Sequence, residues 1–98
     1  MVKTIIWTSP AVADLQDIYD FISKDSEFYA KSFVNELIDS TERLVTFPKI
    51  ARKAPEFDNE NIRDLIFQNY RIIYLIKDES IFILAVVHTR RDLQLPEE

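Results

Sequence analysis

The 98-residue sequence contains no cysteine, no glycine and only one histidine, His88. Without cysteine the chain has no disulfide framework, no cysteine-ligated zinc site and no catalytic thiol. One histidine cannot form a histidine-rich metal site within a single chain, so we expect no metal and no cofactor. The absence of glycine also excludes a glycine-rich phosphate-binding loop and the dinucleotide-binding fingerprint.

Long apolar runs are missing as well. The apolar stretch within residues 1–7 is shorter than that of a signal peptide, and no cleavage site with small residues follows it. No segment approaches the roughly 20 apolar residues that span a bilayer. We therefore expect a cytoplasmic protein without a membrane partner.

The residues that are present suit a folded chain. Hydrophobic residues make up 47% and aromatic residues 12% of the sequence, a composition that separates it from disordered proteins. Because domains typically contain about 100–150 residues, we expect residues 1–98 to form one domain.

Two segments of the first half show the helical spacing of apolar residues. Residues 10–24 predict a helix that Ser9 caps and Pro10 opens, because proline at the first helical position gives up no needed donor. Ser26 caps a second predicted helix over residues 27–47, which ends before Pro48. The short connection favours an antiparallel helical hairpin.

Four segments rich in β-branched and aromatic residues predict strands, at residues 3–7, 62–68, 70–77 and 81–88. Short polar turns join the last three into an antiparallel meander. The predicted class is therefore α+β in the order β-α-α-β-β-β, a small antiparallel sheet packed on the hairpin. Residues 89–98 are a polar tail. Residues 48–61 are either a functional loop or a plain connector.

The net charge of −5 is unevenly distributed. Residues 9–47 carry eight acids and three bases, a balance of −5, whereas residues 48–92 carry eight bases and seven acids, a balance of +1. The alternation of strand side chains places Arg71 opposite Tyr70 and Tyr74, which we expect to pack against the helices. A tight turn at Asn69 would bring Arg63 and Arg71 to the same side of the sheet.

Further bases follow the last strand or lie in the long loop, and they complete a predicted anion-binding surface on the uncovered side of the sheet. These are His88, Arg90, Arg91, Arg52 and Lys53. The alternative is that the cations are paired with the acids nearby, which are Glu56, Asp58, Glu60, Asp64 and Asp92.

Several short motifs occur along the chain in a fixed order. They are Trp7-x-x-x-Ala11-x-x-Asp14-Leu15-x-x-Ile18, Phe47-Pro48, Ala51-Arg52, Pro55-Glu56, Ile62-Arg63-x-Leu65, Tyr70-Arg71-Ile72-Ile73-Tyr74 and Ile83-x-x-x-Val87-His88-x-Arg90-Arg91. Together they resemble toxins of the RelE/ParE superfamily, from bacterial type II toxin–antitoxin modules. The resemblance implies a plasmid-stabilisation or stress module and a cognate antitoxin that wraps and neutralises the toxin.

The two branches of that superfamily differ in their targets. RelE-like members cleave mRNA on the ribosome, and ParE-like members inhibit DNA gyrase. The long second helix and the His88-x-Arg90-Arg91 ending are closer to the ParE-like branch. The sequence pI near 4.8 also disfavours RNA engagement, because phosphate neutralisation drives affinity for nucleic acid. We therefore favour a non-enzymatic gyrase inhibitor, with a ribosome-dependent endoribonuclease as the alternative and an adaptor that only binds antitoxin as a third reading.

If the chain is a ribonuclease, the resemblance implies roles for four residues. Arg71 matches a phosphate-binding arginine, Arg63 falls near a catalytic lysine position, and Arg90 matches a second phosphate-stabilising arginine. His88 could act as acid or base, although a neutral histidine bonded to backbone is the favoured reading. No tyrosine follows the last strand, which departs from the RelE-like pattern. Arg52, Lys53 and Arg91 are the expected target-binding cations.

The helical hairpin and an open sheet edge are the predicted antitoxin-binding features, through strand addition or a helix in a groove. Tyr19, Phe28 and Tyr29 are the candidate contact residues. A homodimer and a hetero-oligomer with the antitoxin both remain open. Asp14, Asp17 and Asp20 recur at spacings of three, and we interpret them as a solvated helix face rather than a metal site.

Overall fold

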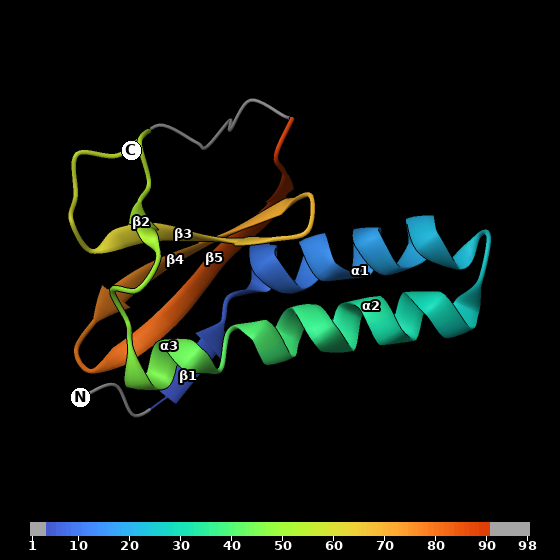
Figure 1. The fold of residues 1–98 in the computed structure, drawn as a ribbon, viewed down its shortest axis with the longest axis horizontal. Helices are drawn as coiled ribbons and strands as arrows, with labels where there is room; N and C mark the ends of the chain where they lie inside the picture. Colours follow the sequence, from blue (N-terminus) through green and yellow to red (C-terminus); the bar gives the residue numbers. More distant parts are fainter. Residues whose placement is uncertain (1–3, 91–98) are drawn as a thin grey trace.

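The computed structural model describes residues 4–90 and shows a five-stranded sheet with a helical hairpin across one face (Figure 1). The elements are β1 (Thr4–Trp7), α1 (Ser9–Ser23), α2 (Glu27–Ser40), α3 (Arg43–Thr46), β2 (Arg52–Lys53), β3 (Ile62–Phe67), β4 (Tyr70–Lys77) and β5 (Ser80–His88). The predicted α+β class and the C-terminal meander are confirmed. Among residues 4–90, no helix is long and apolar enough to cross a membrane.

The sheet order is β1-β5-β4-β3-β2, in which β1 runs parallel to β5 and every other pair is antiparallel. The parallel pair follows from the chain path, since the hairpin and the meander separate β1 from β5. The two-residue strand β2 lies within residues 48–61, where the sequence predicted no strand. It is too short for strand periodicity to show.

The two long helices begin for different reasons. Ser26 caps α2 as predicted, because its side chain accepts the N–H of Tyr29 at 3.1 Å. The predicted cap Ser9 is wrong: the N-cap of α1 is Thr8, and Pro10 lies in the first turn. Thr8 does not cap the helix with its hydroxyl, which donates instead to the carbonyl of Ile83 at 2.7 Å.

The second predicted helix is interrupted near its end. α2 stops at Ser40, and a separate turn, α3, follows. The hydroxyl groups of Ser40 and Thr41 donate to the carbonyls of Leu37 and Ile38, at 2.6 and 2.7 Å. Such local bonds compete with the helical ladder, which explains why the predicted helix over residues 27–47 is divided.

The core lies between the hairpin and one face of the sheet. Its buried side chains are Ala11, Ile18, Phe33, Leu37, Leu44, Leu65, Ile72, Tyr74, Ile81, Ile83 and Val86. A β-bulge at Leu84 makes this set possible, because the register passes from Ile73↔Ala85 to Tyr74↔Ile83. Ile83 and Val86 would otherwise lie on opposite faces of β5.

Because the chain has no glycine, residues with a Cβ atom occupy the left-handed turn positions. The φ angles are 55° at Gln68, 52° at Asp78 and 64° at Glu79. For a residue with a Cβ this conformation costs about 1–2 kcal/mol. The left-handed residues in the two turns of the meander therefore lower the free energy of unfolding.

We predict that Gln68→Gly raises the free energy of unfolding by about 0.5–1 kcal/mol, because relief of the Cβ clash exceeds the added chain entropy. The same substitution at Gln16, exposed in α1, should lower it by about 1 kcal/mol. Urea denaturation of both variants measures the two changes. A loss of stability in both would contradict the turn assignment.

Candidate functional site

Arg71 is the most tightly held of the predicted site residues. It lies on β4, is 6% exposed, and donates from Nε to Asp64 at 2.7 Å. Its two terminal nitrogens donate to the two carboxylate oxygens of Glu56 at 2.6 and 2.7 Å. Arg52 approaches Asp64 from the other side and donates from Nε at 2.7 Å. Two cations and two anions therefore form one neutral network.

The network determines the charge states of its members. The hydrogen bond from Arg71 holds the pKa of Glu56 below its usual value, against a smaller opposing effect of burial. The bond to Glu56 raises the pKa of Arg71, and the bond to Asp64 raises that of Arg52. Glu56, Arg71 and Arg52 are therefore ionised near neutral pH, and both guanidinium groups are already paired. This is the salt-bridged alternative left open by the sequence.

Arg63 lies on the opposite face of the sheet from Arg71, so the expectation that the two share a side is wrong. The register pairs Arg63 with Tyr74 on the helix side, and Ile66 with Arg71 on the other side. The cause is the two-residue turn at Gln68 and Asn69. It pairs odd-numbered residues of β3 with even-numbered residues of β4.

Arg63 and Tyr74 hold the long loop instead of forming a reactive centre. Arg63 donates to the carbonyls of Ala51 and Glu60, at 2.8 and 3.0 Å. The hydroxyl of the buried Tyr74 donates to the carbonyl of Pro48 at 2.6 Å, and burial raises the pKa of Tyr74 to about 12. Residues 48–61 are therefore bound to the sheet at several points.

His88 ends β5 and packs its ring edge-on against Tyr70, with 5.4 Å between the ring centroids. Its Nδ1 accepts the backbone N–H of Arg90 at 3.1 Å. The sequence favoured a histidine bonded to the backbone, and this contact is such a bond. Arg90 is exposed at the end of the sheet near His88, far along β5 from the level of Arg63. Arg91 lies outside the described residues.

The predicted gathering of arginines does not form, because Arg63 and Arg71 lie on opposite faces. Among the described members of the predicted set, the exposed cations are Arg52, with 57% of its side chain exposed, Lys53, with 48%, and Arg90, while Arg63 is partly buried. Lys53 lies 3.7 Å from the fully exposed Asp58, a pair of little energetic weight. Arg52 and Lys53 form the edge strand β2 and remain accessible there.

The predicted contact residues of the hairpin differ in exposure. Phe28 is 82% and Tyr29 57% exposed, whereas Tyr19 is partly buried. Phe21, which sequence reasoning missed, is 69% exposed. Phe21 lies outside the apolar stripe of α1, and this position was the signal in the sequence that could have identified it as an exposed aromatic residue. Phe21 is near the end of α1, and Phe28 and Tyr29 lie in the first turn of α2; we call these three exposed aromatic residues the apolar tip of the hairpin. The hairpin itself extends past the end of the sheet (Figure 1).

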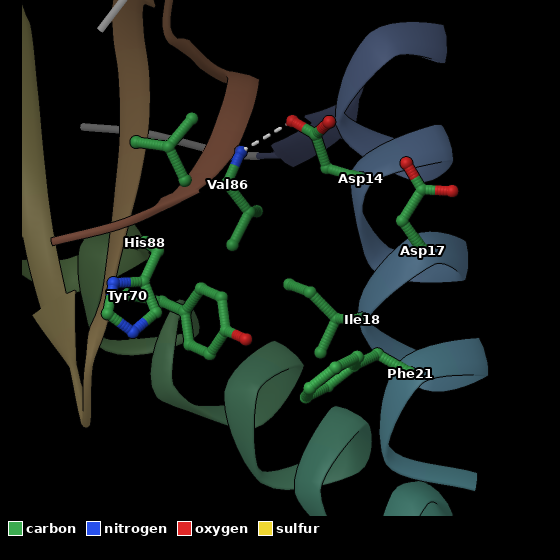
Figure 2. A pocket seen from close by; sticks show the side chains of 8 residues that line it. Asp14, Asp17, Ile18, Phe21, Tyr70, Val86 and His88 are labelled. Carbon is green, nitrogen blue, oxygen red and sulfur yellow. Dashed lines mark hydrogen bonds between the residues drawn. The ribbon is translucent and has the colours of Figure 1, made fainter. Parts of the chain in front are cut away.

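A groove of about 340 Å³ lies between α1 and the last residues of the meander. Figure 2 shows Ile18 and Phe21 reaching from α1 toward Tyr70, with His88 beside that ring. The lining residues are Asp14, Asp17, Ile18, Phe21, Tyr70, Val86, Val87 and His88. Among residues 4–90, no cluster of three or more histidine or carboxylate side chains could hold a metal ion.

Asp14 departs from the solvated face that the sequence predicted for the three aspartates. One of its carboxylate oxygens accepts the backbone N–H of Val86 at 2.9 Å (Figure 2). Asp17 and Asp20 are exposed, as predicted. The spacing along α1 could not reveal the bond of Asp14, because its donor lies 72 residues away in the chain.

Comparisons with known proteins give a consistent family. The family model described as the ParE toxin of the type II toxin–antitoxin system, parDE, matches residues 5–93. This chain belongs to the ParE toxin family. Toxin RelE2 of Caulobacter vibrioides is 28% identical over 88 residues, which cover 89% of this chain and 96% of that protein.

A solved structure described as the chromosomal ParDE TA system from P. aeruginosa has the same fold. It superposes with a TM-score of 0.75 at 22% identity, over 92% of this chain and 98% of that one. The resemblance drawn from the motifs is therefore confirmed, and the protein is a ParE-like toxin of the type II toxin–antitoxin class.

We predict that Arg71→Ala destabilises the toxin by about 3–5 kcal/mol, since it removes one partner of a buried ion network and leaves Asp64 partly unpaired. Lys53→Ala, which removes an exposed pair, should change the free energy of unfolding by less than about 0.5 kcal/mol. Urea unfolding at neutral pH measures both. Equal stability of Arg71→Ala and the parent would show that the network does not support the fold.

A pH dependence follows from Glu56. Its pKa is lower in the folded state than the ordinary value of 4.5, so its stabilisation is complete above that value and is lost as pH falls through the folded pKa. The difference in urea midpoint between the parent and Glu56→Gln should therefore shrink between about pH 6 and pH 3.

Glu36→Gln, at an exposed position of α2, is the matched control for this titration. Its midpoint should follow that of the parent across the same pH range. A difference for Glu56→Gln that stays constant down to pH 3 would contradict the role of the Arg71–Glu56 pair.

Proposed function

We propose that this ParE-like toxin inhibits DNA gyrase by binding to it without an enzymatic step, and that a cognate antitoxin neutralises it in the cytoplasm. The family match supports the toxin class. The choice of gyrase over the ribosome is supported by the state of the arginines, chiefly Arg71.

The observation that carries the proposal is that Arg71 is already neutralised. Metal-independent RNA cleavage needs a base for the 2′-hydroxyl and free cations for the charge that develops on phosphorus. Arg71 is buried with both Asp64 and Glu56 on its guanidinium group. Arg63 lies on the other face and donates to main-chain carbonyls. Arg71 therefore offers no free charge to a phosphate, and Arg63 is separated from it by the sheet.

The overall charge supports the same choice. With a net charge of −5, the protein gains little from counterion release on the ribosome, which is the main source of affinity for nucleic acid. A protein target makes no such demand. We place the target-contacting cations at Arg52 and Lys53 on the edge strand β2, and at Arg91 in the tail.

The antitoxin contact is proposed at the apolar tip of the hairpin. Phe28 and Tyr29 are large, exposed apolar side chains that a partner would remove from water, and Tyr19 lies on the same hairpin with partial exposure. The solved relative is titled as a ParDE system, which supports a partner of the antitoxin kind.

A second candidate is a ribosome-dependent endoribonuclease. The name of the relative Toxin RelE2 favours it, and so does the neighbouring pair of His88 and the exposed Arg90. A non-toxic adaptor that only binds antitoxin is the third candidate, since a fully paired Arg71 also suits a fold without a reactive centre. Induced expression of the protein in a bacterium without antitoxin distinguishes this candidate from the two toxins, because an adaptor leaves bacterial growth unaffected.

We predict that the purified toxin inhibits gyrase supercoiling and does not cut mRNA in a reconstituted translation reaction. Lys53→Glu should raise the concentration for half-maximal inhibition by about three- to tenfold, because a reversed charge at the contact weakens association. Lys31→Glu makes the same charge change on the exposed surface of α2 and should act like the parent.

Two results would overturn this assignment. The first is unimpaired supercoiling at a stoichiometric excess of folded toxin. The second is codon-positioned cleavage of translated mRNA that His88→Ala or Arg90→Ala abolishes, which would establish the ribonuclease instead.

A further inference from the structure

β5 loses its outer neighbour partway along its length. β1 pairs with β5 only as far as Trp7↔Ile83. At Thr8 the chain leaves the sheet, and Thr8 bonds the carbonyl of Ile83 with its N–H at 3.1 Å and its hydroxyl at 2.7 Å. Beyond that point β5 has β4 on one side and, among residues 4–90, no strand on the other (Figure 1).

The direction of the backbone groups on this free edge follows from the ladder. The N–H of Thr89 donates to Asn69 at 2.7 Å, so the hydrogen-bonding groups of the odd-numbered residues here point toward β4. Those of Val86 and His88 therefore point away from it. Asp14 receives the N–H of Val86, but no hydrogen bond within residues 4–90 reaches the carbonyls of Val86 and His88 or the N–H of His88.

The vacated position opens into the groove of Figure 2. One wall is the end of β5 with Tyr70, and the other is α1, which contributes Asp17, Ile18 and Phe21. Asp17 is exposed, and Phe21 is 69% exposed although it is aromatic. An occupant of this place meets an apolar ring, a carboxylate and backbone groups to which no other residue of the described range 4–90 bonds.

We propose that an extended segment of a partner protein adds as a strand to β5 at Val86–His88, with a cationic side chain at Asp17 and an apolar side chain against Phe21. Unpaired edge groups recruit such segments, and alternate side chains of the added strand give specificity. The identity of the partner as the antitoxin rests on the proposed function; the site itself does not.

Charge identifies the kind of segment. The α1 wall of the groove carries the carboxylates of Asp14 and Asp17 and favours a basic side chain of the added strand there, while the exposed Arg90 lies beyond the His88 end of the site. A second copy of this chain is a poor occupant. Pairing of two β5 edges would bring the acidic surfaces of two α1 helices together, which is repulsive.

The test uses the full-length ¹⁵N-labelled toxin and a synthetic peptide of about seven residues in which valine and lysine alternate. Amide hydrogen exchange is measured by NMR. Saturating peptide should slow exchange of the His88 amide by about tenfold or more, because that N–H gains a partner. A peptide N-methylated at alternate nitrogens should not protect it, and neither should a peptide with glutamate in place of lysine.

Matched variants locate the charge. Asp17→Lys should weaken binding of the valine–lysine peptide by about tenfold, whereas Asp39→Lys, the same change at an exposed position of α2, should alter it by less than about twofold. Phe21→Ala should also weaken it. Phe47→Ala, at a side chain 59% exposed outside the groove, is the control.

Three results would overturn the proposal. One is unchanged His88 exchange at saturating peptide. Another is protection of Ile66 in place of His88, which would put the strand on the uncovered edge of β3. The third is His88 protection that rises with toxin concentration alone, which would make a second copy the occupant. The supercoiling assay is independent, so its failure with peptide binding intact would remove only the gyrase assignment.

Discussion

The rest of the structure depends on the carboxylate of Asp64, whose side chain is wholly buried on β3. A buried charge is tolerated only when it is paired, and Arg71 and Arg52 pair it from two sides. Glu56 completes the balance and brings the long loop against the sheet. Arg71 is therefore paired with Asp64, although the family resemblance would assign Arg71 to phosphate binding. The ion pairs that stabilise the fold therefore determine which arginine side chains of the sheet can bind another group.

A second constraint is the point at which β1 ends. Because the chain turns into α1 at Thr8, β5 has an outer neighbour within the described part of the chain only up to Ile83. Asp14 accepts the N–H of Val86, one of the backbone groups beyond the end of β1. The carbonyls of Val86 and His88 and the N–H of His88 border a groove whose α1 wall carries Asp17 and Phe21. Of the predicted target-binding cations, Arg52 and Lys53 lie on β2, away from this groove.

Particular residues show how far the candidate site was predictable. The face of Arg71, opposite Tyr70 and Tyr74, followed from strand alternation and is confirmed by the buried Tyr74. The prediction that Arg63 and Arg71 share a face was wrong, because the face depends on the length of the turn between β3 and β4. A change of one residue in that length moves a side chain to the opposite face of the sheet. The backbone bond of His88 agrees with the interpretation that its position at the end of β5 favoured. Phe21 and the bond of Asp14 were missed, because exposure and partners distant in sequence leave no local pattern.

The sequence by itself determined the α+β class, the hairpin, the meander and the family, because these follow from apolar periodicity, caps and motif order. Helical and strand patterns are local, and they survive without knowledge of what packs against them. Only the tertiary structure decided that Arg71 is neutralised, that Arg63 lies on the other face, that β2 exists and that β1 pairs with only the first part of β5. Each of these depends on pairing between segments far apart in the chain, where one residue of register or one buried carboxylate changes which groups meet.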